Sequence, residues 1–202
     1  MEVVIASGNR GKIEEIRKIL SDMGIKFLSL ENFPQLPAIV EDGTTFEENA
    51  IKKAKEVCER TGKVTIADDS GLEVDCLGGA PGIKSARFGG DGLTDAERNQ
   101  RLLELLKDVP TSKRKARFKC VIAIVIPGRG TRTVSGECDG VISLEVRGNY
   151  GFGYDPVFIP DGYSKTFGEL GSEIKDKISH RAIALSKARE VLLEIIQKVK
   201  RK

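Results

Sequence analysis

Histidine, tryptophan and long apolar runs are scarce or absent in this sequence of 202 residues. There is no tryptophan and one histidine, His180, which excludes a metal site built on two histidines and argues against zinc chemistry. The longest strongly apolar run covers residues 121–126, far short of the roughly 20 residues that cross a bilayer. Met1 leads directly into a strand pattern and not into a signal peptide. We therefore expect a cytoplasmic protein with no membrane partner.

Cysteine and net charge also set limits. The sequence has no Cys-x-x-Cys pair, so we expect buried thiols rather than a metal site or disulfides at Cys58, Cys76, Cys120 and Cys138. The net charge of +3 is too small to indicate a nucleic-acid partner, and we interpret the basic clusters at 113–115 and 198–202 as a solvated loop and tail. Apolar residues at 40% and charged residues at 31% describe an ordinary globular protein, most simply one domain.

Two adjacent carboxylates, Asp68 and Asp69, follow a short apolar segment at 64–67 that is typical of a buried strand. Neighbouring side chains on a strand point to opposite faces, so these two acids should have different environments and different roles. One could bind a hard cation or polarise a water molecule while the other fixes a turn. The alternative is that both belong to an ordinary Asp-Ser-Gly turn, and this stretch alone supports it equally well.

A strand, a loop and a helix are expected at the start of the chain. Residues 2–6 are continuously apolar after Glu2, and apolar residues recur at helical spacing from Ile13 to Met23. The loop between them would aim backbone N–H groups and the positive end of the helix dipole at one spot, which would suit phosphate. The residues concerned are Ser7, Gly8, Asn9, Arg10, Gly11 and Lys12. A simple turn in which Ser or Asn caps the helix is the alternative.

Another helix is expected after Thr45, which fits a capping box with Glu48. Glu41 precedes that helix, and capping does not require it. Lys53 falls in the first turns, where the helix dipole disfavours a cation unless an anion is near. Its position indicates a ligand phosphate, although an exposed surface lysine is the alternative.

Several further elements follow from the pattern of apolar and turn residues. We predict a strand at 26–30, an irregular segment at 32–38, a surface loop at 85–92, a helix that begins with a capping box at 94–97, and a hairpin of strands 116–126 and 131–146. A last helix would begin near Ser179, with His180 and Arg181 in its first turn. Positive side chains there oppose the dipole, so their partner should be negative or carbonyl-bearing, with a surface salt bridge as the alternative.

Three glycines alternate with three aromatic residues in the segment 148–156. Such a segment makes a poor strand or helix, but it lets the backbone approach a flat ligand while a ring stacks on that ligand. A purine base is one candidate. An aromatic-rich loop anchored in the core is the alternative.

In their order along the chain, these stretches resemble the inosine triphosphate pyrophosphatase family, also called the Ham1 or non-canonical purine NTP pyrophosphatase family. The resemblance runs from about residue 3 to the last helix. The motifs that carry it are Ser7-Gly8-Asn9-x-x-Lys12, Glu41 with Thr45-Phe46-x-Glu48-Asn49-Ala50, Ala67-Asp68-Asp69-Ser70-Gly71, Gly79-Ala80-Pro81-Gly82-x-x-Ser85-Ala86-Arg87, Gly151-Phe152-Gly153-Tyr154-Asp155-Pro156 and Ser179-His180-Arg181.

The resemblance implies an α/β protein with a long twisted mixed sheet and flanking helices, forming two lobes around a central substrate cleft. Residues 1–202 would form this single two-lobed domain, with a homodimer as the usual assembly. The family hydrolyses ITP, dITP and XTP to the nucleoside monophosphate and pyrophosphate with Mg²⁺, which removes these nucleotides from the pool.

The resemblance also implies roles for individual residues. The triphosphate would be held by the segment from Ser7 to Lys12 together with Lys53, and the metal by Glu41 and Asp69. Asp69 would act as general base, with Ser70 next to the substrate. Phe152 would stack on the base, and the remaining contacts to the nucleotide would come from Gly153, Tyr154, Asp155, Lys175, His180 and Arg181.

Chemistry supports a preference among purines. Hypoxanthine and xanthine carry a 6-keto acceptor where adenine carries an amino donor, so a cationic donor such as Arg181 or His180 would reject adenine. Guanine also has a 6-keto group, and the sequence does not reveal how GTP is rejected. Three rival functions are a Maf-like pyrophosphatase for other modified or pyrimidine nucleotides, a nucleotide sensor without turnover, and an RNA-binding protein.

Overall fold

The computed structural model describes residues 1–37 and 39–200. Ala38, part of the predicted irregular segment, and residues 201–202 of the predicted basic tail lie outside the described residues. No helix in the described part of the chain is both long enough and apolar enough to span a membrane.

Six strands form one mixed sheet in the order β2-β1-β3-β4-β5-β6. β1 pairs in parallel with β2 and with β3, so that Val3 lies opposite Phe27 on one side and Val64 on the other. β5 and β6 are antiparallel, with Val141 opposite Ile159. The strands are β1 (Glu2–Ile5), β2 (Lys26–Ser29), β3 (Val64–Val74), β4 (Lys115–Ile126), β5 (Gly130–Ile142) and β6 (Phe158–Pro160). This mixed α/β architecture, with helices flanking the sheet, agrees with the predicted fold class.

The chain divides into two compact units. The first unit comprises Met1–Asp69, Cys120–Gly136 and Arg181–Lys202, and the second comprises Ser70–Lys119 and Glu137–His180. The boundaries between the units fall inside β3, inside β4, inside β5 and after the first residue of the helix His180–Lys200. These three strands therefore contribute residues to both units.

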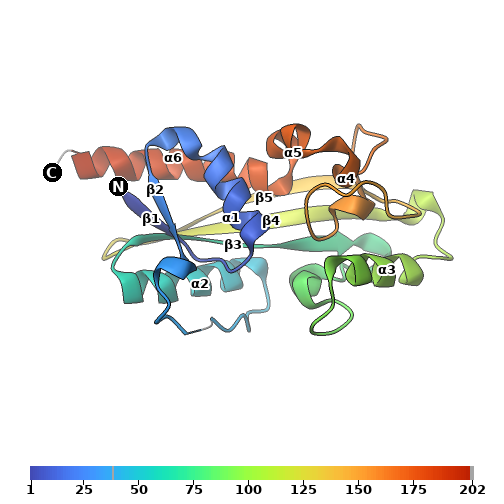
Figure 1. Ribbon diagram of the computed structural model, residues 1–202, viewed down its shortest axis with the longest axis horizontal. Coiled ribbons are helices and arrows are strands. Elements are labelled where there is room, and N and C mark those ends of the chain that lie inside the picture. Colours follow the sequence, from blue (N-terminus) through green and yellow to red (C-terminus); the bar gives the residue numbers. More distant parts are fainter. Residues whose placement is uncertain (38, 201–202) are drawn as a thin grey trace. The chain divides into compact units, whose positions relative to one another are not determined.

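The first unit has two apolar clusters, because side chains of its strands alternate between the two faces of the sheet. Val3, Ile5 and Ile66 pack with α1 (Arg10–Ile19) and α6 (His180–Lys200). Val4 and Ala67 pack with α2 (Phe46–Thr61). In Figure 1, α1 and α6 accordingly lie on one side of these strands and α2 lies on the other.

The second unit packs around aromatic side chains. The Phe118 and Phe158 rings meet edge to face with their centroids 4.7 Å apart, and the Phe158 and Phe167 rings stack at 5.5 Å. Leu102 joins this cluster from one of the unit's three α-helices, which are α3 (Asp95–Leu105), α4 (Phe167–Leu170) and α5 (Ser172–Ile178). The short segments Gly82–Arg87 and Asp155–Val157 are 3₁₀ helices.

Three sequence predictions about local structure were wrong. β3 does not end at Ala67 but continues through both carboxylates to Val74, so the turn interpretation fails. The strand continues because each carboxylate finds charged partners on its own face of the sheet. β5 ends at Ile142 rather than at residue 146, because the Ser143 hydroxyl donates to the Glu145 carbonyl and turns the chain. The segment 85–92 begins inside a 3₁₀ helix and Ser85 is buried, so it is not simply a surface loop.

The predicted starts of the helices are mostly confirmed. The Asn9 side chain accepts a hydrogen bond from the Lys12 N–H and caps α1, and Thr94 and Glu97 form the predicted capping box of α3. Thr45 caps α2, but the Glu48 carboxylate accepts from Thr44 rather than from Thr45, so only half of that predicted box forms. Ser179 separates α5 from α6, which places His180 and Arg181 in the first turn of α6, as predicted.

The thiols are free, as predicted, but they are not all buried. Cys58, Cys120 and Cys138 are buried, and burial raises the pKa of each thiol, in the case of Cys138 to about 12. Cys76 is exposed, because it lies in the turn that follows β3.

We expect Ellman's reagent at pH 8 to modify one thiol rapidly in the native protein, because Cys76 alone among the four is exposed. All four should react after denaturation in guanidinium chloride. The variant Cys76→Ser should show no rapid reaction in the native state. Rapid reaction of two or more thiols in the native wild type would contradict this assignment of burial.

Candidate active site

Asp68 and Asp69 leave opposite faces of β3, as the alternation of strand side chains predicts. Asp68 follows Ile66 onto the face covered by α1 and α6, and Asp69 follows Ala67 onto the face covered by α2. The two acids therefore have different partners. Asp68 is 1% exposed and Asp69 is 6% exposed.

On the α2 face, the Lys53 ammonium group lies between two carboxylates. Its Nζ donates to Asp69 Oδ1 at 2.9 Å, to Glu41 Oε1 at 2.8 Å and to the Asp68 carbonyl at 2.9 Å. The Asn49 amide donates to the other oxygen of Asp69 at 3.3 Å. Lys53 is buried, so the alternative of an exposed surface lysine was wrong. The anion that the sequence required near this lysine is supplied by the protein's own acids.

These contacts shift the pKa values of the residues involved. Burial raises the pKa of Asp69, and the charge of Lys53 offsets that effect only in part. Burial also acts to lower the pKa of Lys53, but the charges of Asp69 and Glu41 outweigh it and raise that pKa. A carboxylate with a raised pKa accepts a proton more readily, so Asp69 is suited to act as a base.

On the opposite face, Asp68 is enclosed by cations. Lys12 Nζ lies 2.5 Å from its Oδ1, and Arg181 Nε lies 2.9 Å from its Oδ2, which also accepts from the Cys120 thiol. Arg181 is 1% exposed and binds Glu15 with another nitrogen of its guanidinium group. The negative partner predicted for Arg181 is therefore a buried acid, and the alternative of a surface salt bridge was wrong.

Asp68 is unsuited to proton transfer. Its burial alone would raise the pKa, but the charges of Arg181 and Lys12 prevail and hold the pKa well below the usual range of a carboxyl group. Burial alone would lower the pKa of the Arg181 guanidinium, but the charges of Asp68 and Glu15 prevail and raise it. The ion pairs of Asp68 therefore fix the positions of Lys12 and Arg181.

The loop before α1 forms the helix cap that the sequence suggested as the alternative to a phosphate site. Gly8, Asn9 and Arg10 are exposed, at the N-terminal end of the helix. The Ser7 hydroxyl accepts from the Asn9 N–H at 3.2 Å, and the Asn9 side chain accepts from the Lys12 N–H at 3.1 Å. The cap forms, and an exposed helix N-terminus beside Lys12 remains compatible with phosphate binding.

A second cluster lies within the second unit, around Phe152. Asp155 Oδ2 accepts from the Phe152 N–H at 2.9 Å and from Lys175 Nζ at 2.5 Å. The same Nζ lies 4.5 Å from the centre of the Phe152 ring, within the range of a cation–π interaction. Asp155 and Lys175 are buried, whereas Phe152 keeps part of its surface exposed. The structure thus brings together three residues predicted to contact the nucleotide.

The other predicted residues of this unit are fixed in different ways. The Tyr154 hydroxyl donates to the Ser85 carbonyl at 2.9 Å, and burial raises the pKa of Tyr154. The buried His180 ring stacks on Phe118 with centroids 4.6 Å apart and planes 10° apart. Ser70 lies in β3 directly after Asp69 and is half-buried.

Sequence reasoning missed two residues of α3. Asp95 accepts a hydrogen bond from the Gly153 N–H, and Asn99 donates one to the Gly153 carbonyl. Their spacing of four places both on one helix face, a signal that was available in the sequence. The spacing alone does not indicate a partner, because Gly153 lies more than fifty residues away in the sequence.

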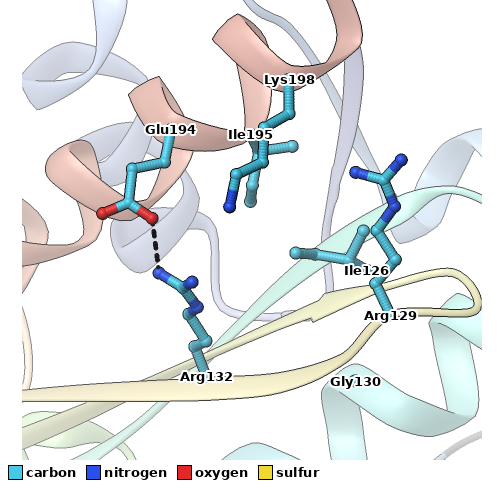
Figure 2. A pocket seen from close by; sticks show the side chains of 7 residues that line it. All are labelled: Ile126, Arg129, Gly130, Arg132, Glu194, Ile195 and Lys198. Atoms are coloured by element: carbon cyan, nitrogen blue, oxygen red, sulfur yellow. Dashed lines mark hydrogen bonds and ion pairs between the residues drawn. The ribbon is translucent and has the colours of Figure 1, made fainter.

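Figure 2 shows a hollow of about 210 Å³ in the first unit, between the β4–β5 turn and the end of α6. Arg132 pairs there with Glu194 at 2.7 Å, and Arg129 and Lys198 complete the polar rim. Cations near the C-terminal end of a helix are explained by its dipole. None of the residues predicted to form the active site lines this hollow, so we do not assign the reaction to it.

The α2 face can accommodate a hard cation. No three histidine, cysteine, aspartate or glutamate side chains are grouped for metal binding within residues 1–37 and 39–200. The carboxylates of Glu41 and Asp69, however, both bind the ammonium group of Lys53, so their oxygens lie around one spot. Mg²⁺ prefers oxygen ligands and keeps several waters, so two carboxylates together with substrate phosphates are a suitable donor set.

We expect the variant Asp68→Asn to lower the free energy of unfolding by about 3–5 kcal/mol, because Lys12 and Arg181 would lose a buried countercharge. Urea denaturation at pH 7 measures this. The folded-state pKa of Asp68 lies below the ordinary 3.8, so its contribution is complete above that pH and is lost as the pH falls through the lower value.

Asp22→Asn is the matched control for this variant. It breaks an ion pair with Arg189 in which the Asp22 side chain is 69% exposed, so stability should scarcely change. Equal losses in the two variants would contradict the importance assigned to the buried cluster.

The chain is similar to curated proteins over nearly its whole length. The chain is 50% identical over 192 residues to the dITP/XTP pyrophosphatase of Desulforamulus reducens, covering 95% of this chain and 96% of that protein. It is 47% identical to the dITP/XTP pyrophosphatase of Bacillus subtilis, with 95% and 96% covered.

Solved structures are similar over the same length. A HAM1 protein from Coxiella burnetii has a TM-score of 0.87 at 42% identity, covering 96% of this chain and 99% of that chain. The Ham1 protein of Staphylococcus aureus has a TM-score of 0.85 at 38% identity, with the same coverage. The sequence profile of the Ham1 family matches residues 3–191, which confirms the resemblance seen in the motifs, and the chain belongs to the Ham1 family.

Proposed function

We propose that this protein is a dITP/XTP pyrophosphatase, which hydrolyses dITP, XTP and ITP to the nucleoside monophosphate and pyrophosphate. Full-length relatives at 50% and 47% identity that carry this activity in their names support the proposal. The observation that carries it is the placement of one buried lysine, Lys53, between Glu41 and Asp69. That arrangement places a base, a cation and two carboxylate groups at one spot.

Binding of the triphosphate is assigned to the first unit. Ser7 to Lys12 would offer backbone N–H groups and the positive end of α1, and Lys12 and Lys53 would add two full charges. Because an attacking water must approach a polyanion, neutralising the phosphate charge is needed before a base can act. The ion pair with Asp68 fixes Lys12 for this role.

Asp69 is proposed as the general base. Its raised pKa favours taking a proton from the water that attacks the α-phosphorus, and general base catalysis contributes about 10²–10⁴-fold. Mg²⁺, held by Glu41 and Asp69, would neutralise phosphate charge and make a bound water more acidic. Asn49 and Lys53 would keep the carboxylate oriented, and Ser70 would lie next to the substrate. Cleavage of the bond between the α-phosphorus and the bridging oxygen then releases pyrophosphate.

Recognition of the purine base of the substrate is assigned to residues predicted from the family. Phe152 would stack on the purine, and Gly153, Tyr154, Asp155 and Lys175 would complete the pocket. His180 and Arg181 are the proposed donors to the 6-keto group, which adenine lacks. Stacking on Phe118 and the ion pairs of Arg181 fix the orientation of these two side chains. A site built on donors to an acceptor can exclude its amino analogue by several orders of magnitude.

Four broader expectations stay proposals. The family resemblance supports a long twisted sheet with two lobes around a substrate cleft, a homodimer, and a cytoplasmic location. It also supports a single domain of residues 1–202, and the passage of β3, β4 and β5 through both units is consistent with this.

The activity is tested by release of pyrophosphate with Mg²⁺ from ITP, XTP, GTP, ATP and dTTP, detected with a coupled pyrophosphatase. We expect ITP and XTP to be preferred at least tenfold over the other three. Turnover of dTTP as fast as that of ITP would favour a Maf-like pyrophosphatase instead. Binding of ITP without pyrophosphate release would indicate a sensor.

The role of Asp69 as general base is tested by the variant Asp69→Asn, which should lower kcat by about 10²–10⁴-fold while binding of ITP persists. Asp91→Asn, a change at an exposed acid of the second unit, is the control and should leave kcat unchanged. Full activity of Asp69→Asn would move the role of base to another group.

Urea unfolding tests the single domain. Far-UV circular dichroism and the reactivity of the buried thiols should give one transition with the same midpoint, because three strands belong to both units. Two separated transitions would show that the units unfold independently.

A further inference from the structure

Gly153 has both of its backbone hydrogen-bonding groups bound by side chains of one helix. Its N–H donates to Asp95 Oδ2 at 2.7 Å, and its carbonyl accepts from Asn99 Nδ2 at 2.9 Å. The two side chains are one helical turn apart on α3, so they form a fixed pair of contacts. We call Asp95 and Asn99 the α3 clamp.

Helix α3 does not itself require these two side chains. An acid at position 95 suits the first turn of a helix, but the dipole does not explain a hydrogen bond to a distant loop. Asn99 is 2% exposed, and a buried amide is costly unless it forms hydrogen bonds. Asp95 is itself held by Arg98, whose Nη2 lies 2.7 Å from its other oxygen. Arg98 therefore helps to orient Asp95 toward Gly153.

Gly153 lies between two rings that differ in burial. Tyr154 is buried and its hydroxyl is bound to the Ser85 carbonyl, whereas Phe152 is partly exposed beside Lys175. The backbone at Gly153 has φ of +62°, a conformation that glycine adopts without strain. Rotation about this flexible residue would move Phe152 relative to the anchored Tyr154. By binding both sides of Gly153, the clamp opposes that rotation.

We propose that Asp95 and Asn99 are positioning residues for purine selectivity, which act by holding Gly153 and thereby the Phe152 ring. The inference rests on the proposed function of Phe152. Stacking on an aromatic ring tolerates any base, so discrimination depends on donors and acceptors that meet a base held in one place. A ring that can shift allows a mismatched base to move away from an unfavourable contact. The phosphate chemistry lies on other residues and is unaffected.

The test compares Asp95→Ala and Asn99→Ala with wild type on ITP and GTP. Each variant loses one hydrogen bond to Gly153, so we expect the ratio of kcat/KM for ITP over GTP to fall roughly 3–10-fold. The loss should appear as a higher KM for ITP, with kcat changed by less than about twofold. Asp95→Asn keeps an oxygen that can accept from the Gly153 N–H and should restore most of the ratio.

Glu97→Ala is the matched control on the same helix. It breaks the capping box with Thr94 but makes no contact with Gly153, so it should lower the melting temperature and leave the ratio unchanged. An unchanged ratio in folded Asp95→Ala and Asn99→Ala would overturn the proposal. A ratio that falls equally in Glu97→Ala would also overturn it, because general loosening of α3 would then be the cause.

Failure of the proposed function would look different. The wild type would then release no pyrophosphate from ITP, whereas failure of the clamp leaves wild-type turnover intact. If the wild type releases no pyrophosphate, the ratio of dissociation constants for ITP and GTP, measured by equilibrium dialysis, replaces the kinetic ratio. The same fall in the alanine variants is expected, and its absence would overturn the clamp.

Discussion

Alternation of side chains along β3 is the constraint on which the candidate site depends. Two consecutive acids on a strand must face opposite ways, and here the two faces are covered by different helices, one by α1 and α6 and the other by α2. Asp68 therefore meets Lys12 and Arg181, and Asp69 meets Lys53. If the register of β3 slipped by one residue, both acids would exchange partners and apolar neighbours at once. The geometry of the strand alone therefore places Asp68 and Asp69 in two different environments.

The two faces hold their acids in different states. Around Asp68, the effect of burial is outweighed by the cations Arg181 and Lys12, which lower the pKa of the carboxyl group. On the other face, Glu41 and Asp69 both bind Lys53, but burial prevails and raises the pKa of Asp69. Buried ions are costly unless they are paired, so the cluster around Asp68 is suited to rigidity. A carboxyl group with a raised pKa is suited to exchanging a proton during a reaction.

The sequence was informative where local rules decide the structure. The opposite faces of Asp68 and Asp69, the cap at Asn9 and the start of α6 all follow from periodicity or helix-end chemistry. Predictions from the sequence failed where contacts with residues distant in the chain determine the local structure. Nothing near Asp68 indicated that β3 would continue through it, because the cations that stabilise it come from α1 and α6. The burial of Lys53 and the roles of Asp95 and Asn99 were hidden for the same reason.

The glycines of the Phe152 segment illustrate how a correct signal can have a second cause. The sequence suggested that they let the backbone approach a flat ligand. At Gly151, with φ of +78°, an added Cβ would collide with the carboxylate of Asp155. This glycine is therefore already required by the protein itself, because Asp155 must reach the Phe152 N–H and Lys175 together. A residue that shapes a binding loop can thus be indispensable without touching any ligand.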